Sequence, residues 1–153
     1  MLVYRLTKKK YKDNLSGKGA AIRGARWNSV GMEIIYTASS RALAMSEVAV
    51  HITYEMMPAD YWMIEIDLPD NLLIASCETL PDNWNAFPYT DASKKIGDKF
   101  IIDNAYVALR VPSAVVQKEW NILINPLHTD FKKVKTVESE PFVFDRRLFK
   151  PLK

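Results

Sequence analysis

Glu47 and His51 are one helical turn apart in a segment that could form the wall of a pocket. A core-facing stripe is predicted because apolar residues recur at helical spacing, namely Met45, Val48, Ala49, Ile52 and Met56. Glu47 and His51 fall on the opposite face, which they share with Leu43, Val50 and Tyr54. An exposed face would be more polar, so this setting favours a carboxylate in a pocket. From composition alone, a solvated surface glutamate is the simpler interpretation.

The first 30 residues form a cationic segment on a mildly acidic chain. Eight Lys and Arg residues stand there against Asp13 alone, so this segment carries +7 and the rest of the chain −4. Such a segment favours an anionic ligand, usually a phosphate in some form, although Lys8 to Lys12 are most simply a solvated loop. Arg5 and Arg26 differ because each stands beside aromatic or apolar residues. Their guanidinium groups could be held against packed surface and make bidentate contacts with phosphate.

Ser113, Tyr36 and the single cysteine give weaker signals. Ser113 follows Pro112 at a predicted strand end, where a turn or cap role is the default, and Tyr36 alone is most simply a core residue. No Gly-x-Ser-x-Gly elbow surrounds Ser113, so a hydrolase triad with His128 is not proposed. Cys77 has no cysteine partner and no metal-ligand spacing with the two histidines. We therefore expect neither a disulfide nor a metal site.

The elements that must position these residues are short and mostly strands. Residues 2–6 and 33–38 are predicted strands, and the loop between them, residues 7–31, holds four of the five glycines and is expected to be functional. Thr37, Ser39 and Ser40 are possible N-caps of a helix that runs to about Met57 and stops at Pro58. Further strands are predicted at residues 61–68, 106–111, 115–116, 122–124, 133–137 and 142–144, and a further helix, weakened by Gly97, at residues 91–103. The pattern predicts an α+β fold, a single mixed domain with a strand-rich core over residues 1–153.

Length and composition exclude several classes of protein. The chain has 153 residues, 48% of them hydrophobic and 25% charged, which is enough for one globular domain and unlike a disordered chain. The longest apolar run, Ala105 to Leu109, is far shorter than the ~20 residues that span a bilayer. A secretory signal has a basic stretch followed by an apolar one, whereas here the apolar residues 1–6 come before Lys8 to Lys10 and no apolar stretch follows. We expect a cytoplasmic protein without a membrane partner.

Several short motifs, taken in order, form one composite signature along most of the chain. They are Tyr4-Arg5-Leu6, Gly17-x-Gly19-Ala20, Gly24-Ala25-Arg26-Trp27-Asn28-x-x-Gly31, Ile35-Tyr36, Ala44-x-x-Glu47-x-x-x-His51, Pro112-Ser113-Ala114-Val115-Val116 and Glu119-x-Asn121-x-Leu123-x-Asn125-Pro126-x-His128. This ordered set resembles the RES domain family, which is named for an Arg, a Glu and a Ser. The family contains toxins of bacterial type II toxin-antitoxin pairs whose antitoxin carries an Xre-type helix-turn-helix domain.

The resemblance implies a fold similar to that of ADP-ribosyltransferase toxins and an enzyme that consumes NAD as its substrate, without a metal. Matched motif by motif, the Arg, Glu and Ser of the family fall on Arg26, Glu47 and Ser113, which are the expected catalytic residues. Arg5 and Tyr36 match further pocket positions, and His51 is expected beside them. Cleavage of the nicotinamide-ribose bond passes through an oxocarbenium-like state, for which one well-placed carboxylate suffices.

The sequence leaves the acceptor of the ADP-ribosyl group open between water, phosphate and a protein side chain. The implied activities are therefore those of an NAD glycohydrolase, an NAD phosphorylase or an ADP-ribosyltransferase. Two other functions remain open, a ribonuclease toxin that uses the basic N-terminal segment and a non-catalytic nucleotide-binding module. The implied partner is an Xre-type antitoxin, with a homodimer possible within the complex and DNA contacted only through the antitoxin.

Overall fold

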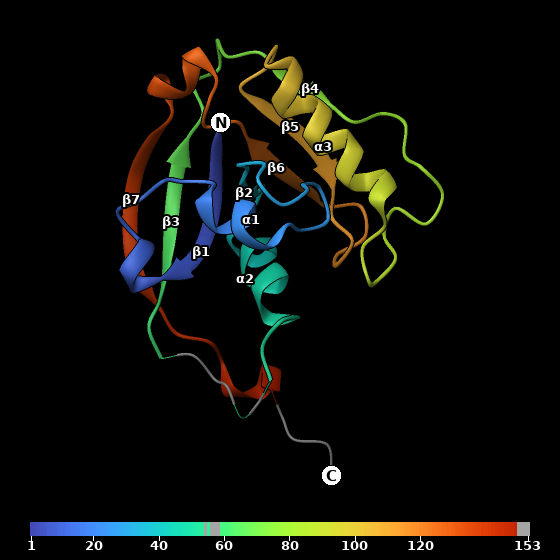
Figure 1. The fold of residues 1–153 in the computed structure, drawn as a ribbon. Helices are drawn as coiled ribbons and strands as arrows, with labels where there is room; N and C mark the ends of the chain where they lie inside the picture. Colours follow the sequence, from blue (N-terminus) through green and yellow to red (C-terminus); the bar gives the residue numbers. More distant parts are fainter. Residues whose placement is uncertain (54, 56–58, 150–153) are drawn as a thin grey trace.

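The computed structural model describes residues 1–53, 55 and 59–149, which form one mixed sheet with helices packed on it (Figure 1). The strands are β1 (Leu2–Lys8), β2 (Ile35–Ala38), β3 (Tyr61–Asp67), β4 (Ile74–Ser76), β5 (Ala108–Pro112), β6 (Trp120–Ile124) and β7 (Lys135–Phe142). The α-helices of the described residues are α1 (Lys18–Arg23), α2 (Arg41–Ala49) and α3 (Asp91–Asp103), and short 3-10 helices are η1 (Lys9–Tyr11), η3 (Thr129–Lys133) and η4 (Arg146–Phe149). The α+β class with a strand-rich core is confirmed.

Among the described residues, the sheet has seven strands in the order β4-β5-β6-β2-β1-β3-β7. Of these described strands, β4 and β5 pair in parallel and all other neighbours pair antiparallel. Alternation along β3 places Ile64 and Ile66 in the central core, as the sequence predicts. Met63, on the other face of β3, is also buried, because α2 and the chain around Phe144 cover it. β3 is therefore covered on both faces at Met63 and is not simply a half-buried strand.

β1 and β2 part from each other in the middle of the sheet. β1 pairs with β3 along its whole length, but its one paired position with β2 is Tyr4 opposite Ala38. The next positions, Arg5 on β1 and Thr37 on β2, are not paired, so the two strands diverge there. This divergence leaves room for side chains of both strands to face a common space.

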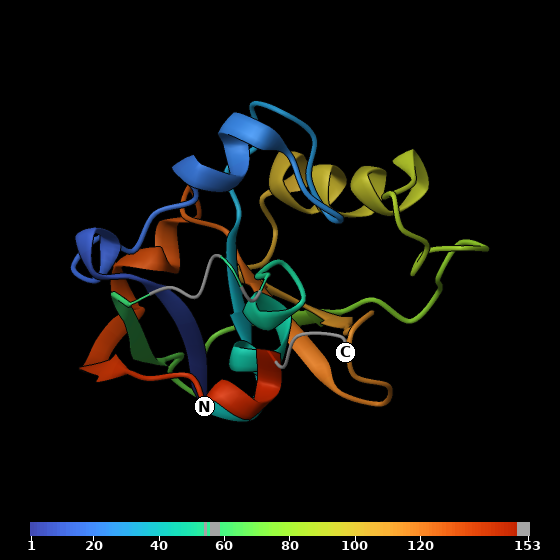
Figure 2. The same ribbon diagram turned by 90° about the horizontal axis from the view of Figure 1, so that it is seen from below.

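The predicted helix at residues 91–103 is confirmed as α3, and Gly97 is required where it stands. α1 and α3 lie on the same side of the sheet (Figure 2). A Cβ at Gly97 would lie 1.6 Å from the backbone oxygen of Trp27, so only glycine allows this approach of helix to loop. Asp98 then accepts hydrogen bonds from the N–H and the hydroxyl of Ser29, at 2.8 and 2.5 Å. α3 thus fixes the segment around Trp27.

Other predicted elements differ from the structure. The predicted loop at residues 7–31 contains η1 and α1, because Gly17 and Gly24 bound a short helical turn within it. Residues 115 and 116 form a turn rather than a strand, since both backbone N–H groups bind the Ser113 hydroxyl. The predicted strand at residues 133–137 is the start of a longer strand, β7, which ends at Phe142, so residues 143 and 144 of the second predicted strand lie beyond it. β4 was missed because it has only three residues.

The helix after β2 begins where expected but is shorter than predicted. Ser40 is its N-cap and accepts a hydrogen bond from the Leu43 N–H at 3.1 Å. α2 ends at Ala49, and the predicted positions Tyr54, Met56, Met57 and Pro58 lie outside the described residues. The fully buried residues of α2 are Leu43 and Ala44, so Leu43 packs in the core and does not line the pocket. Met45, Val48 and Ala49 of the predicted core stripe are only partly buried, and Val48 lines the pocket. Within the described part of the chain, no helix is long and apolar enough to cross a membrane.

Candidate active site

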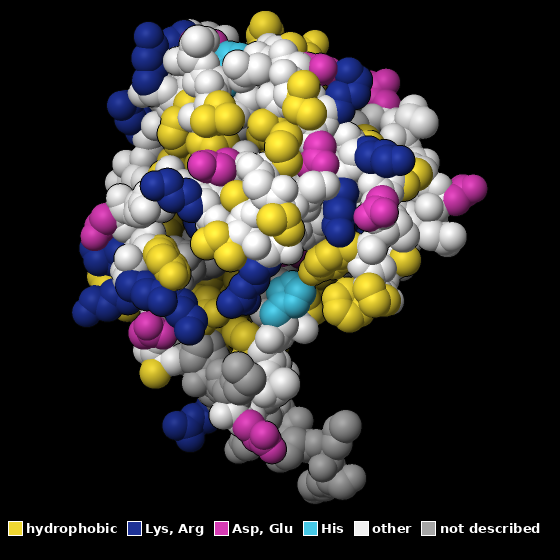
Figure 3. All heavy atoms as spheres, viewed as in Figure 1, with side chains coloured by type: hydrophobic (Ala, Val, Ile, Leu, Met, Phe, Trp, Pro, Cys, Tyr) yellow, Lys and Arg dark blue, Asp and Glu magenta, His cyan; other side chains and the backbone are white. Residues whose placement is uncertain are grey.

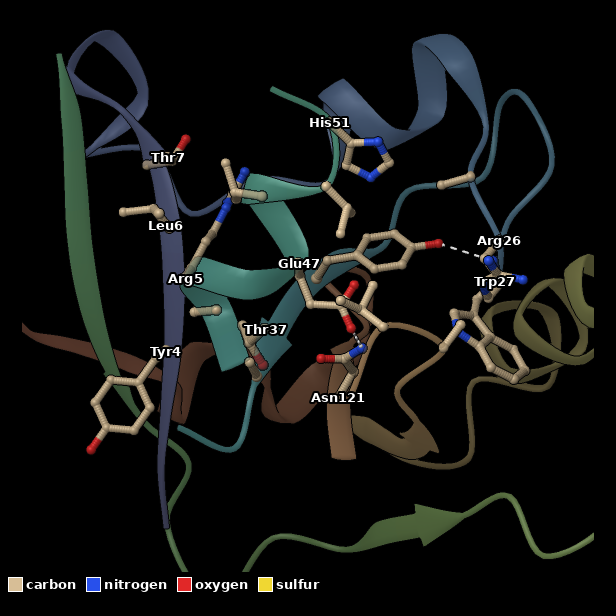
Figure 4. Close-up of a pocket in the computed structure, with 18 of the residues that line it drawn as sticks. Tyr4, Arg5, Leu6, Thr7, Arg26, Trp27, Thr37, Glu47, His51 and Asn121 are labelled. Atoms are coloured by element: carbon tan, nitrogen blue, oxygen red, sulfur yellow. Dashed lines mark hydrogen bonds between the residues drawn. The ribbon is translucent and has the colours of Figure 1, made fainter. Parts of the chain in front are cut away.

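The space left where β1 and β2 part opens into a pocket of about 690 Å³. Its walls come from residues 4–7 of β1, residues 36–38 of β2, the segment at residues 25–27, one face of α2, and loop residues 85, 87, 89, 114 and 115. Figure 4 shows Glu47 near the centre, with Arg5 on one side and Arg26 on the other. The pocket therefore combines one carboxylate with two guanidinium groups from distant parts of the chain.

Glu47 is held through one oxygen of its carboxylate. Oε1 accepts hydrogen bonds from the Ser113 hydroxyl and from the Asn121 amide, each at 2.6 Å. Ser113 Oγ itself accepts the N–H groups of Val115 and Val116, so its single proton is directed to Glu47. Within the described part of the chain, Oε2 receives no hydrogen bond. The arrangement fixes the carboxylate and leaves one oxygen for a ligand.

Arg5 places a positive charge in a largely buried position of the pocket wall. Burial lowers the pKa of its guanidinium, and no carboxylate contributes to that shift. Its one hydrogen bond to the described residues is a long one, from Nη1 to the Ser16 carbonyl at 3.4 Å. Because Arg5 has no carboxylate partner among the described residues, its guanidinium can pair with a phosphate or carboxylate of a ligand.

Arg26 holds a loop from the other side of the pocket. Its Nη1 donates to the carbonyls of Trp84 and Ala86, at 2.8 and 2.9 Å. The guanidinium carbon lies 4.8 Å from the centroid of the Tyr89 ring. The Nε and Nη2 donors of Arg26 have no partner among the described residues. Arg26 can therefore hold the loop and still donate to a ligand.

Tyr36 and His51 complete the predicted set in different ways. The Tyr36 hydroxyl donates to Asn28 Oδ1 at 2.7 Å and accepts the Trp27 N–H at 3.2 Å, while burial raises its pKa. Its ring lines the pocket, and its hydroxyl fixes the segment at residues 27–28. His51 is exposed just beyond α2, at the edge of the pocket. Figure 3 shows Lys and Arg side chains gathered with hydrophobic side chains over the region of η1 and the end of β1.

A family model for the RES domain matches residues 2–145 of the chain. The chain belongs to the RES domain family. A "Prs ADP-ribosylating toxin" of Sphingobium sp. (strain YBL2) is 39% identical to this RES domain protein over 142 residues, covering 90% of this chain and 88% of the relative. A "Toxin Res" of Photorhabdus laumondii subsp. laumondii is 38% identical over 156 residues and covers 100% of both chains.

The fold is shared with a solved structure as well. The crystal structure of the M. tuberculosis MbcT-MbcA toxin-antitoxin complex contains a chain that matches with a TM-score of 0.73 at 22% identity. The match covers 93% of this chain and 84% of that chain. At this level of identity, the likeness shows that the two chains share a fold.

The fold brings all the predicted site residues of this RES domain protein together. The side chains of Arg5, Arg26, Tyr36, Glu47 and His51 line the pocket, and Ser113 lies behind Glu47. Sequence reasoning gave no role to Asn121, although it stands in the Glu119-x-Asn121 motif that helped to identify the family. The loop residues Asn85, Phe87 and Tyr89 were also missed, because no local pattern indicates that they reach the pocket.

Proposed function

We propose that this RES domain protein is the toxin of a type II toxin-antitoxin pair and that it cleaves NAD at the nicotinamide-ribose bond. The observation that carries this proposal is the Glu47 carboxylate, held at Oε1 by Ser113 and Asn121 and open at Oε2 toward a pocket that contains Arg5. The name of one relative, an ADP-ribosylating toxin, supports the same reaction class, and the name of the other, a Res toxin, supports the role as a toxin.

Glu47 acts on charge that develops at the ribose. As the bond to nicotinamide breaks, both bonding electrons leave with the pyridinium nitrogen, so nicotinamide departs neutral and C1′ becomes an oxocarbenium-like centre. A carboxylate fixed beside that centre offsets the new positive charge and accepts a hydrogen bond from a ribose hydroxyl. Because the leaving group already carries positive charge, it needs no general acid. Ser113 serves by orienting Glu47, and its proton is already committed to that carboxylate.

The two arginines and the remaining pocket residues bind the rest of the dinucleotide. Arg5 pairs with the pyrophosphate, since its buried guanidinium has no carboxylate partner among the described residues. Arg26 contributes its free donors from the other side of the pocket. Tyr36 packs against the nicotinamide or ribose, and His51 orients substrate at the edge. NAD is the substrate, and this mechanism uses no metal.

The fate of the ADP-ribosyl group defines three activities within this proposal. Transfer to water makes the enzyme an NAD glycohydrolase, transfer to phosphate an NAD phosphorylase, and transfer to a protein side chain an ADP-ribosyltransferase. Reaction of the purified protein with NAD in water, in phosphate buffer and with a cell extract separates them by product. The products are free ADP-ribose, ADP-ribose 1″-phosphate and ADP-ribosylated protein, respectively.

An enzyme that destroys NAD in the cytoplasm of its own cell must be inhibited from outside. We propose an Xre-type helix-turn-helix antitoxin as the partner, with a toxin homodimer possible in the complex and DNA bound only by the antitoxin. The structurally similar M. tuberculosis chain comes from a toxin-antitoxin complex, which supports an antitoxin as the partner. Co-expression with the adjacent reading frame, followed by purification through a tag on one chain, tests the association.

The deciding experiment measures nicotinamide release from NAD and the integrity of added RNA in the same reaction. We expect nicotinamide to appear while the RNA stays intact, and the Glu47→Gln variant to lose the release. Cleavage of RNA without nicotinamide would instead favour a ribonuclease toxin. Binding of NAD with neither reaction would favour a non-catalytic nucleotide-binding module.

A further inference from the structure

Loop residues 84–89, here called the aromatic wall, form one side of the pocket. Asn85, Phe87 and Tyr89 from this loop line the pocket directly. The rings of Phe87 and Tyr89 pack edge to face, with centroids 5.6 Å apart at an interplanar angle of 82°. Phe87 is 78% exposed, so most of its ring is free for a ligand rather than buried in the core. An exposed aromatic ring at a pocket is a stacking surface for a planar base.

Two consecutive residues, Arg26 and Trp27, contact the aromatic wall. Arg26 binds the carbonyls of Trp84 and Ala86 and lies against the Tyr89 ring. Trp27, which is 2% exposed, stacks on Trp84 with ring centroids 5.9 Å apart at an interplanar angle of 28°. The two hydrogen bonds of Arg26 join residues that lie 58 and 60 positions apart in the sequence. The position of Phe87 and Tyr89 thus depends on Arg26.

We propose that the aromatic wall is a binding subsite for one planar base of NAD, and that Arg26 acts on substrate binding largely by holding this wall in place. In this role Arg26 is a positioning residue for Phe87 and Tyr89. The proposal rests on the proposed function for the identity of the substrate. The base is either nicotinamide or adenine, and both offer the flat π-face that an exposed phenylalanine ring recognises.

The first test compares substitutions of Phe87, which is exposed and whose loss should not disturb the fold. Phe87→Ala should raise KM for NAD about tenfold with kcat changed less than threefold, because stacking acts before the chemical step. Phe87→Tyr keeps a ring and should restore KM to within threefold, whereas Phe87→Leu should not. The matched control is Tyr106→Ala, an aromatic residue that is 41% exposed and not part of the pocket wall. An unchanged KM in Phe87→Ala would overturn the subsite.

The second test asks whether Arg26 works through the wall. In a double-mutant cycle of Arg26→Ala and Phe87→Ala, the combined rise in KM should be well below the product of the two single effects. The reason is that a wall released from Arg26 no longer presents Phe87 to the base. Effects that simply multiply would show that Arg26 and Phe87 contact NAD independently, and the positioning role would be wrong. Thermal unfolding of each variant shows that the fold is retained.

Calorimetric binding separates the two bases and also separates this proposal from the proposed function. ADP-ribose shares the adenine and pyrophosphate of NAD but lacks nicotinamide. NAD binding is measured in the Glu47→Gln background. If Phe87→Ala weakens the binding of both ligands about tenfold, the wall holds adenine. If it weakens only the binding of NAD, the wall holds nicotinamide. A protein that binds NAD through Phe87 but releases no nicotinamide would contradict the proposed function alone. If the protein releases nicotinamide but the parent and Phe87→Ala bind NAD and ADP-ribose with equal affinity, only the subsite proposal would be contradicted.

Discussion

The Ser113 hydroxyl lies 2.6 Å from Oε1 of Glu47, while its oxygen accepts two backbone N–H groups from the turn that follows it. A hydroxyl with one proton and two accepted hydrogen bonds can donate in one direction only. The turn therefore fixes the proton of Ser113 toward the carboxylate. Sixty-six positions separate the two residues in sequence, so the fold and not local spacing brings them together.

This relationship predicts a specific effect of Ser113→Ala. The variant removes one of the two hydrogen bonds to Oε1 and leaves Asn121 as the other. We expect kcat for nicotinamide release to fall about tenfold or more, since a poorly fixed carboxylate stabilises the transition state less. KM should change little, because Ser113 lies behind Glu47. Steady-state kinetics check the split, and Ser113→Cys, which keeps a weaker donor, should fall between Ser113→Ala and the parent protein.

Glu47→Gln should abolish most of the activity while keeping the binding of NAD. The amide has nearly the shape of the carboxylate but carries no negative charge at the developing oxocarbenium centre. We expect turnover to fall by about two or more powers of ten, with a calorimetric Kd for NAD within a few fold of that of the parent. Near-normal turnover on a folded protein would mean that the assigned mechanism is wrong. His51→Ala, one turn further on, should have a milder effect.

Arg5→Ala should weaken NAD binding, because the pyrophosphate loses a buried cationic partner. A hydrogen bond to a charged group contributes about 1.5–3 kcal/mol, which corresponds to a KM increase of about ten- to a hundredfold. Arg5→Lys should recover part of this loss, since it keeps the charge but not the planar fork. The control is Lys8→Ala, a change of an exposed basic residue at the end of β1 and outside the pocket wall. An equal effect of both substitutions would point to diffuse charge rather than a bound phosphate.

The sequence predicted which residues form the site better than it predicted the contacts that hold them in place. Residue types and the family resemblance identified Arg5, Glu47 and Ser113, and the helical spacing placed Glu47 on α2. The contact from Arg26 to the loop at residues 84–89 could not be predicted, because it joins backbone carbonyls that any residue provides. β4 was missed for a related reason. Its three residues pair in parallel with β5, which lies more than 30 positions further on.

Tyr36 should make the stability of the folded protein fall at alkaline pH. Burial raises the pKa of Tyr36 in the folded protein above the value of about 10 in an unfolded chain. Between these two values the unfolded chain loses a proton that the folded protein keeps, so the free energy of unfolding should fall as pH rises above about 10. Denaturant titrations at pH 8 to 11 measure this fall, and Tyr36→Phe should reduce it. An equal fall in Tyr36→Phe would assign the effect to other groups.

Gly97→Ala tests whether the contact between α3 and the Trp27 segment supports the site. A Cβ at position 97 would lie 1.6 Å from the Trp27 carbonyl oxygen and 2.7 Å from its carbon, both in backbone that cannot move without shifting Arg26. Overpacking of this kind costs about 3 kcal/mol, although alanine is intrinsically the better helix former. Gly97→Ala should therefore lower the unfolding free energy by roughly that amount and raise KM for NAD, measured by chemical denaturation and steady-state kinetics.

Gly19→Ala is the matched control for this substitution, since Gly19 also lies in a helix, α1, but has open space where a Cβ would stand. We expect it to leave the unfolding free energy unchanged or to raise it by up to about 1 kcal/mol, because alanine favours the helix and limits the unfolded chain. The difference between the two variants isolates the packing effect from helix propensity. If Gly97→Ala matched Gly19→Ala in stability and in KM, α3 would not be the support that holds Trp27, and through it Arg26, at the edge of the pocket.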